Sequence, residues 1–223
     1  MYEKIKSLAK QYYPETVAIR RDLHKYPEQG WLEMRTASLV AKKLEKLGYQ
    51  VLIGKEIMCE EYRMGVPDQE ILESNYQRAI SQGADPYYIK KVKDGFTAVA
   101  GILKNGSGPV VAIRFDMDAL CIEEDDSINH NPGKFGFISC NQGTMHACGH
   151  DGHVAIGLTV AKILSNIKDS IQGTIKLIFQ PAEEGVRGAK SICKSGILKD
   201  VDYIFAGHIW QQEANEDYDI YLG

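Results

Sequence analysis

The chain has 223 residues, of which 44% are hydrophobic and 25% are charged, and its formal net charge is −4. This length and composition predict one globular domain with a substantial core. The small negative charge gives no electrostatic basis for binding nucleic acid or an anionic membrane surface.

The N-terminal segment mixes charged with apolar residues and lacks the continuous apolar core of a secretory signal. No apolar run reaches the roughly 18 residues of a membrane-spanning helix. The five cysteines are scattered and odd in number, unlike the framework of a disulfide-rich secreted protein. We therefore expect a cytoplasmic protein that has neither nucleic acid nor a membrane among its partners.

Helical periodicity is present in residues 3–26 and 36–48, and a short strand is predicted over 49–53. Residues 54–93 are polar and are predicted to form a helical insertion in two pieces, one beginning near Pro67 and the other near Pro86. Three later runs are rich in β-branched and aromatic residues and are expected to be buried strands, namely 109–115, 173–180 and 201–207. Helices are predicted at 152–167 and 188–195. This alternation predicts an α/β fold with a mainly parallel, mixed sheet flanked by helices.

Each of these three strands leads directly into residues that can bind a metal or transfer a proton. Asp116 and Asp118 follow the first strand, Glu183 and Glu184 follow the second, and His208 follows the third. Because the carboxyl ends of parallel strands share one edge of the sheet, where such folds place their ligands, we expect these side chains to converge. By itself each group also has a structural explanation, such as a solvated turn for the two glutamates. Their placement at successive strand ends favours a common site.

The segment from Met145 to His153 reads M-H-A-C-G-H-D-G-H and precedes the predicted helix at 152–167. Three chemistries are open for it: a metal site, a thiol nucleophile with its base, or a polar loop. Cys148 and His150 can project into one site from a loop, whereas they would diverge on a regular helix. Thiolate and imidazole are good zinc ligands, and carboxylates complete such shells for zinc, manganese or cobalt.

The other polar residues near this cluster are judged separately. Asp151 is predicted either to hold a ligating imidazole or to cap the helix that follows, and both interpretations are open. His146 and His153 are not expected to be metal ligands. His24 is expected to have a helix-end or packing role.

Five motifs occur along the chain in a fixed order. They are R-D-L-H-K-Y-P-E with Glu33 and Thr36 following (21–36), F-D-M-D-A-L (115–120), H-A-C-G-H-D (146–151), Q-P-A-E-E-G (180–185) and G-H-I (207–209). In these motifs the sequence resembles the metal-dependent amidohydrolases grouped with aminoacylases, carboxypeptidase G and the plant hydrolases of auxin–amino acid conjugates.

The resemblance implies a zinc-exopeptidase-like catalytic domain with two divalent ions, which can be zinc, manganese, cobalt or nickel. It implies that Cys148, His150, Glu184 and His208 are metal ligands and that Glu183 is the general base for a metal-activated water. Asp118 would orient a ligand or polarise the site. The implied reaction is hydrolysis of the amide bond of an N-acyl amino acid or a related amino acid conjugate.

The sequence departs from the family after His208, because only fifteen residues follow and none is a histidine. Family members continue into a lid and dimerisation domain and later contribute a further histidine ligand. Residues 1–223 are therefore expected to be the N-terminal part of an incomplete catalytic domain without its lid, and homo-oligomers to be a property of the full-length enzyme. Two alternatives stay open: a non-catalytic metal-binding fragment, and a cysteine hydrolase with Cys148 as nucleophile and His150 or His208 as base.

Overall fold

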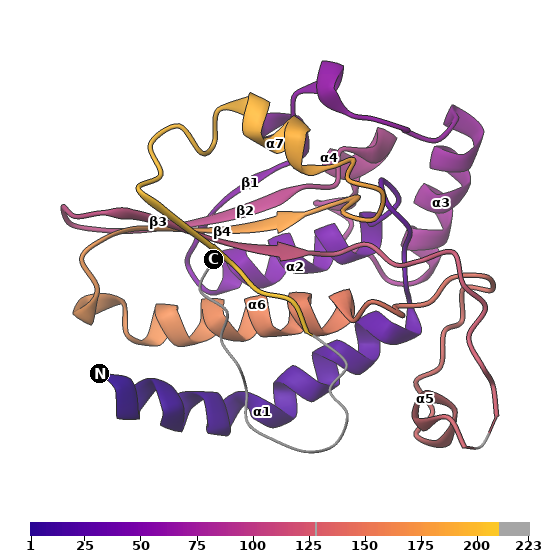
Figure 1. Cartoon of the computed structure of the whole chain (residues 1–223), viewed down its shortest axis with the longest axis horizontal. Helices are drawn as coiled ribbons and strands as arrows, with labels where there is room; N and C mark the ends of the chain where they lie inside the picture. The colour runs from indigo at the N-terminus through magenta and orange to yellow at the C-terminus, as the bar shows by residue number, and fades with distance from the viewer. Residues whose placement is uncertain (128, 210–223) are drawn as a thin grey trace.

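The computed structural model describes residues 1–127 and 129–209, in which the strands form one mixed sheet (Figure 1). The strands are β1 (Gln50–Ile53), β2 (Val99–Asn105), β3 (Val110–Asp116), β4 (Gly173–Gln180) and β5 (Tyr203–Ala206). Their order across the sheet is β1-β2-β4-β3-β5. β3 pairs in parallel with β4 and with β5, whereas β2 pairs antiparallel with β1 and β4. Of these strands, β2 alone runs against the common direction.

Helices lie on both faces of the sheet (Figure 1). They are α1 (Tyr2–Lys25), α2 (Met34–Lys46), α3 (Gln69–Ser81), α4 (Ile89–Val92), α5 (Asn131–Lys134), α6 (His150–Asn166) and α7 (Ala189–Ser195). Short 3₁₀ turns are η1 (Gly54–Glu56), η2 (Glu60–Tyr62), η3 (Lys93–Gly95) and η4 (Lys168–Ser170). α2 and α6 pack on one face, α1 packs on the outer side of α6, and α7 lies on the opposite face.

The predicted mixed α/β sheet flanked by helices is confirmed, but β2 is missing from the sequence prediction. Gly101, in the middle of this strand, weakens its β-signal because glycine has no side chain to pack. A Cβ atom at this position would lie 3.0 Å from a methyl carbon of Leu44 and 3.1 Å from the Tyr49 ring. The missing side chain at Gly101 thus weakens the strand pattern in the sequence and also lets α2 approach the sheet.

β2 and β3 are joined by a short turn, yet they do not pair, because β4 lies between them. Gly173, the first residue of β4, enters this gap with φ +105°, where a Cβ would lie 2.3 Å from the carbonyl oxygen of Pro109. Only glycine fits this conformation and this close approach. The insertion of β4 makes β3 and β4 neighbours, so that their carboxyl ends reach the same edge.

Apolar side chains fill both sides of the sheet. Leu44, Leu158 and Phe179 belong to the cluster under α2 and α6, and Ile178 and Ile192 belong to the cluster under α7. Within residues 1–127 and 129–209, no helix combines the length and the apolar character needed to cross a bilayer.

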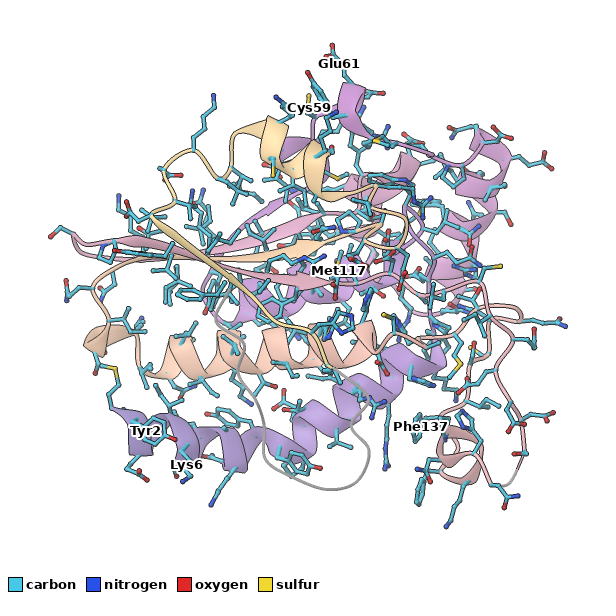
Figure 2. All side chains as sticks on the ribbon, in the orientation of Figure 1. Tyr2, Lys6, Cys59, Glu61, Met117 and Phe137 are labelled. Carbon is cyan, nitrogen blue, oxygen red and sulfur yellow. The ribbon has the colours of Figure 1, made fainter. Side chains whose placement is uncertain are left out.

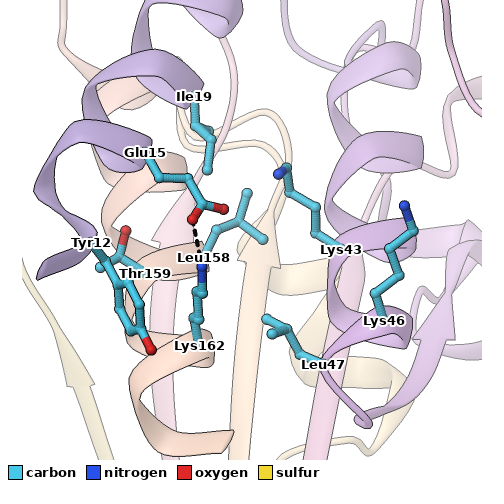
Figure 3. A pocket seen from close by; sticks show the side chains of 9 residues that line it. All are labelled: Tyr12, Glu15, Ile19, Lys43, Lys46, Leu47, Leu158, Thr159 and Lys162. Atoms are coloured by element: carbon cyan, nitrogen blue, oxygen red, sulfur yellow. Dashed lines mark hydrogen bonds and ion pairs between the residues drawn. The ribbon is translucent and has the colours of Figure 1, made fainter. Parts of the chain in front are cut away.

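A cavity of about 150 Å³ opens between α1, α2 and α6 (Figure 3). Ile19, Leu47 and Leu158 form part of its apolar lining, and Lys162 pairs there with Glu15 at 2.5 Å. Lys162 lies twelve residues along α6 from the helix start, which corresponds to about 18 Å. This cavity is therefore separate from the polar groups at the carboxyl edge of the sheet.

Candidate metal centre

The carboxyl ends of β3, β4 and β5 bring the predicted polar residues to one edge of the sheet. Asp116, the last residue of β3, lies opposite Gln180, the last residue of β4. Asp118, Glu183, Glu184 and His208 follow these strands within a few residues. Met117, between the two aspartates, is fully buried and lies near the middle of the molecule (Figure 2).

The N-terminus of α6 delivers the remaining groups to this edge. The helix begins at His150, two residues earlier than predicted, so His150 belongs to its first turn and only Cys148 lies in the preceding loop. Gly149 occupies the N-cap with φ +81° and no side-chain cap. This left-handed residue reverses the chain between Cys148 and His150. Both side chains can consequently face one centre, as expected, although one of them is helical.

His150 is the residue around which the candidate ligands gather, and it is fully buried. Potential ligand atoms of Cys148, His150 and His208 lie within 4.8 Å of one another, and so do those of His150, Glu183 and Glu184. His150 Nε2 is 3.9 Å from Glu184 Oε1 and 4.0 Å from Glu183 Oε2. These distances are too long for hydrogen bonds and leave space between the groups.

Two aspartate carboxylates also lie close to the ring nitrogens of His150. Its Nδ1 lies 3.4 Å from Asp118 Oδ1, and its Nε2 lies 3.7 Å from Asp116 Oδ1. Burial opposes protonation of the ring, but the charges of Asp118 and Asp116 outweigh it and raise the pKa of His150. The field at this position therefore favours a positive charge.

His208 presents one ring nitrogen to the cluster. Its Nδ1 donates a hydrogen bond to the carbonyl oxygen of Ile209 at 2.6 Å, which leaves the lone pair of Nε2 available in the neutral ring. Nε2 lies 3.4 Å from Cys148 Sγ. This is the arrangement that ligating histidines usually have, with one nitrogen anchored to an oxygen and the other turned toward the site, here toward the Cys148 thiol.

The thiol of Cys148 is not activated in this environment. Burial raises its pKa, and the neighbouring carboxylates of Glu184, Glu183 and Asp116 raise it further, to about 11. A nucleophilic cysteine needs surroundings that lower its pKa. The surroundings of Cys148 disfavour the cysteine-hydrolase interpretation.

Asp118 fixes the turn that carries the two glutamates. It is fully buried, and its Oδ1 and Oδ2 accept the backbone N–H groups of Glu183 and Glu184, both at 3.0 Å. Glu183 keeps 36% of its side chain exposed, whereas Glu184 keeps 25%. Glu183 can therefore reach a water molecule while Glu184 points inward.

Two residues of this centre have no assigned role in the sequence analysis. Glu33 is fully buried and accepts hydrogen bonds from Thr97 Oγ1 at 2.7 Å and from the Ala182 N–H at 2.8 Å. Burial and the charge of Asp118 raise the pKa of Glu33 well above its usual value. Arg114 lies 2.7 Å from Asp116 Oδ2 and 4.0 Å from Glu183 Oε1. Arg114 could have been noticed in the sequence, because it is the charged residue in the apolar run 109–115.

His153 and His146, which were not expected to be ligands, differ in their contacts. His153 lies within reach of Asp116 and His150, but its Nδ1 interacts with Asp116 Oδ1 and its Nε2 accepts the Ile209 N–H at 2.8 Å, so both nitrogens are occupied. His146 is buried without a hydrogen-bond partner on either nitrogen, and burial lowers its pKa to about 4. His146 belongs to none of the groups of close ligand atoms among the described residues. That neither histidine is a ligand stays a prediction.

Asp151 is not the N-cap residue of α6, which is Gly149, but its Oδ1 accepts the backbone N–H of Gly152 in the first turn at 2.8 Å. Its Oδ2 lies 2.8 Å from His24 Nδ1, and His24 Nε2 lies 2.8 Å from Glu124 Oε1. Burial opposes protonation of His24, but the hydrogen bonds to Asp151 and Glu124 outweigh it and raise its pKa. His24 thus has more than a packing role: it joins α1, α6 and the loop after β3.

The donor set fits a divalent cation. Both ring nitrogens of His150 and Oε1 of Glu184 are buried without a hydrogen-bond partner. An unpartnered buried polar atom costs about 1–3 kcal/mol, which a bound cation would offset. Thiolate, imidazole and carboxylate together suit zinc, manganese or cobalt.

The chain is similar to several known hydrolases and peptidases. Residues 112–222 match Peptidase family M20/M25/M40. The chain is 47% identical over 208 residues to a p-aminobenzoyl-glutamate hydrolase protein of Escherichia coli, and the match covers 93% of this chain and 48% of that protein. It is 49% identical over 201 residues to indole-3-acetyl-aspartic acid hydrolase of Enterobacter agglomerans, covering 90% of this chain and 46% of that protein.

A solved Bacillus subtilis structure, described as a dinuclear metal-binding peptidase from the M20 family, superposes with a TM-score of 0.65. It is 30% identical, and the match covers 89% of this chain and 44% of that one. The chain spans about half the length of the curated relatives it matches. The fold, the ordered motifs and these matches together show that the chain belongs to peptidase family M20/M25/M40.

Proposed function

We propose that residues 1–223 form the N-terminal, metal-binding part of the catalytic domain of an amidohydrolase, with 54–93 as a helical insertion. One observation carries the proposal: Cys148, His150 and His208 form one group of close ligand atoms, Glu184 belongs to a second, and the two groups share the buried, unpartnered His150. We assign these four residues as ligands of two divalent ions, which can be zinc, manganese, cobalt or nickel.

The side chains around the ligands have distinct tasks. When bound, the ions would acidify a water molecule and polarise the scissile carbonyl. Glu183, which is the more exposed of the two glutamates, accepts the proton of that water and passes it to the leaving amine. Asp118 holds the Glu183–Glu184 turn through two backbone N–H groups, and thereby keeps both carboxylates near His150.

The substrate class follows from the relatives. Their names specify p-aminobenzoyl-glutamate and indole-3-acetyl-aspartic acid, in which an aromatic acyl group is joined to an acidic amino acid. We propose an N-acyl amino acid or related amino acid conjugate as the substrate of the whole protein. Its amide bond is the bond that breaks.

Metal binding is the direct test of this proposal. Dialysed protein is titrated with Zn²⁺ or Mn²⁺, and bound metal is measured by calorimetry and elemental analysis. We expect about one to two ions per chain, lost in Cys148→Ser and Glu184→Gln. Cys59→Ser and Glu61→Gln are matched controls, because both residues lie on the far edge of the molecule (Figure 2). A wild-type chain that binds neither ion would refute the proposal.

The role of Glu183 requires a second experiment. The substitution Glu183→Gln is made in protein that has first been shown to hydrolyse p-aminobenzoyl-glutamate or indole-3-acetyl-aspartate. The variant should lose turnover and keep the bound metal. Activity retained in this variant would exclude Glu183 as the base. Metal lost in this variant would instead make Glu183 a ligand.

A further inference from the structure

His153 lies at the centre of the candidate site, although it is not one of the proposed ligands. It stands one turn of α6 after His150 and is 4% exposed. Its ring stacks on the His150 ring, with centroids 5.2 Å apart, and meets the His208 ring edge-on at 4.5 Å. A residue so placed could bind a metal or could organise the residues that do.

The hydrogen bonds of His153 decide between these two roles. The backbone N–H of Ile209 donates to Nε2 at 2.8 Å, so Nε2 carries no proton and its lone pair is occupied. The ring proton must then reside on Nδ1, which donates to Asp116 Oδ1. In this tautomer no nitrogen of His153 is left for a cation.

The Ile209 backbone leads directly to a proposed ligand. Its N–H is held by His153, and its carbonyl oxygen accepts the hydrogen bond from His208 Nδ1 at 2.6 Å. Holding this residue therefore sets the orientation of the His208 ring, whose Nε2 lies 3.4 Å from Cys148 Sγ. The connection runs from Asp116 at the end of β3, through His153 on α6, to the segment that follows β5.

The packing of Ile209 independently shows that this segment is docked on α6. A Cβ atom at Gly152 would lie 2.5 Å from Ile209 Cδ1, which is closer than real contacts allow. Glycine at this position lets the Ile209 side chain rest against the first turn of the helix. Two separate features, a hydrogen bond and a side-chain contact, thus hold the same residue.

We infer that His153 is a positioning residue: its fixed tautomer joins Asp116 to the Ile209 backbone and thereby orients His208 toward Cys148. The effect of His153 on metal binding rests on the proposed metal-binding function. The hydrogen bonds themselves exist without a metal, so they can be tested separately.

Two substitutions divide the contacts of His153. His153→Gln can place an amide oxygen near the position of Nε2 and still accept the Ile209 N–H. His153→Asn can place an amide N–H near Nδ1 and still donate to Asp116, but it is too short to reach Ile209. His130→Asn serves as the matched control, because the His130 ring pairs with Glu124 in the loop after β3 rather than with a proposed ligand.

The first measurement uses metal-free protein. Amide hydrogen exchange by NMR should show a protected Ile209 N–H in the wild type and in His153→Gln, and loss of that protection in His153→Asn. The ¹⁵N shifts of the His153 ring should show a protonated Nδ1 and an unprotonated Nε2. Equal Ile209 protection in the wild type and in His153→Asn would overturn the inference, whether or not the protein binds metal.

The second measurement uses Co²⁺, whose thiolate charge-transfer band reports the bond to Cys148. Loss of an outer partner typically weakens metal affinity roughly 10- to 100-fold, and we expect this loss in His153→Asn with a weakened band. Gly152→Ala, whose added methyl group meets only the end of the Ile209 side chain, should weaken binding less than His153→Asn, and His153→Gln should bind within a few-fold of wild type.

The outcomes separate the two ideas. If wild-type protein binds Co²⁺ and His153→Asn matches it in affinity and spectrum, the positioning role is wrong while the metal site stands. If wild-type protein binds no divalent ion, the proposed function fails, and the Ile209 exchange result alone decides the role of His153. Should His153→Asn fail to fold, the ¹⁵N shifts of the wild-type His153 ring and the Ile209 protection in His153→Gln still decide the role of His153, since a protonated Nε2 or an unprotected Ile209 N–H would overturn it.

Discussion

Replacing Asp118 with asparagine tests whether one buried carboxylate holds the Glu183–Glu184 turn. Its two oxygens accept the backbone N–H groups of Glu183 and Glu184 at 3.0 Å each, and hydrogen bonds to a charged group contribute about 1.5–3 kcal/mol each. In Asp118→Asn one oxygen becomes an NH₂ group, which faces a backbone donor and leaves that donor unsatisfied at about 1–3 kcal/mol.

A smaller effect opposes this loss. The charge of Asp118 raises the pKa of the buried carboxyl of Glu33, and removing that charge relieves the repulsion. We therefore expect a net destabilisation of about 2 kcal/mol, near the lower end of the hydrogen-bond range. For a domain of this size it corresponds to a decrease in Tm of about 4–8 °C.

The assay is thermal and urea unfolding of metal-free protein, followed by circular dichroism. Asp169→Asn in the exposed η4 turn is the matched control and should change Tm by about 2 °C or less, since exposed substitutions usually fall within ±0.5 kcal/mol. The same decrease in both variants would refute the account of Asp118. A stable Asp118→Asn protein with normal metal affinity would refute it more completely, since the glutamate turn would then need no buried anchor.

Further predictions concern three other buried positions. Glu33→Gln should leave the free energy of unfolding nearly unchanged, because the raised pKa favours the uncharged carboxyl that glutamine resembles. Glu33→Ala should instead cost about 2–4 kcal/mol, because it leaves two buried donors unpaired. Equal losses of stability in urea unfolding would contradict this reasoning. Because the pKa of His24 is raised in the folded state, its charge contributes fully to stability below the unfolded pKa of 6.5, and this contribution is lost as pH rises through the folded pKa. The destabilisation by His24→Asn should therefore shrink between pH 6 and pH 9. A pH-independent difference in unfolding free energy would show that the charge is unimportant. Gly157→Ala places a methyl group 2.8 Å from both Phe115 and Phe179 and should cost about 1–3 kcal/mol through overpacking; a Tm equal to or above that of the wild type would show that the two rings can move apart.

The predicted strands over 109–115 and 173–180 correspond closely to β3 and β4, because runs of β-branched and aromatic residues carry their own signal. β2 was not predicted because it contains Gly101, which has no side chain to add to the strand pattern and which leaves space for Leu44. The position of β4 between β2 and β3 depends on backbone packing around Gly173, which no local pattern contains.

The sequence by itself determined which residues could form the site. The rule that parallel strands end at one edge predicted that Asp118, Glu183, Glu184 and His208 converge. Cys148 and His150 follow no strand, and they were added because thiolate and imidazole are good metal ligands. Only the tertiary structure decided which hydrogen bonds the neighbouring residues, such as His153, make. Which nitrogen of His153 carries the proton depends on an aspartate 37 residues before it and on a backbone N–H 56 residues after it. Such contacts are set by the packing of β3, α6 and the segment after β5, and packing over these separations leaves no periodic trace in the sequence.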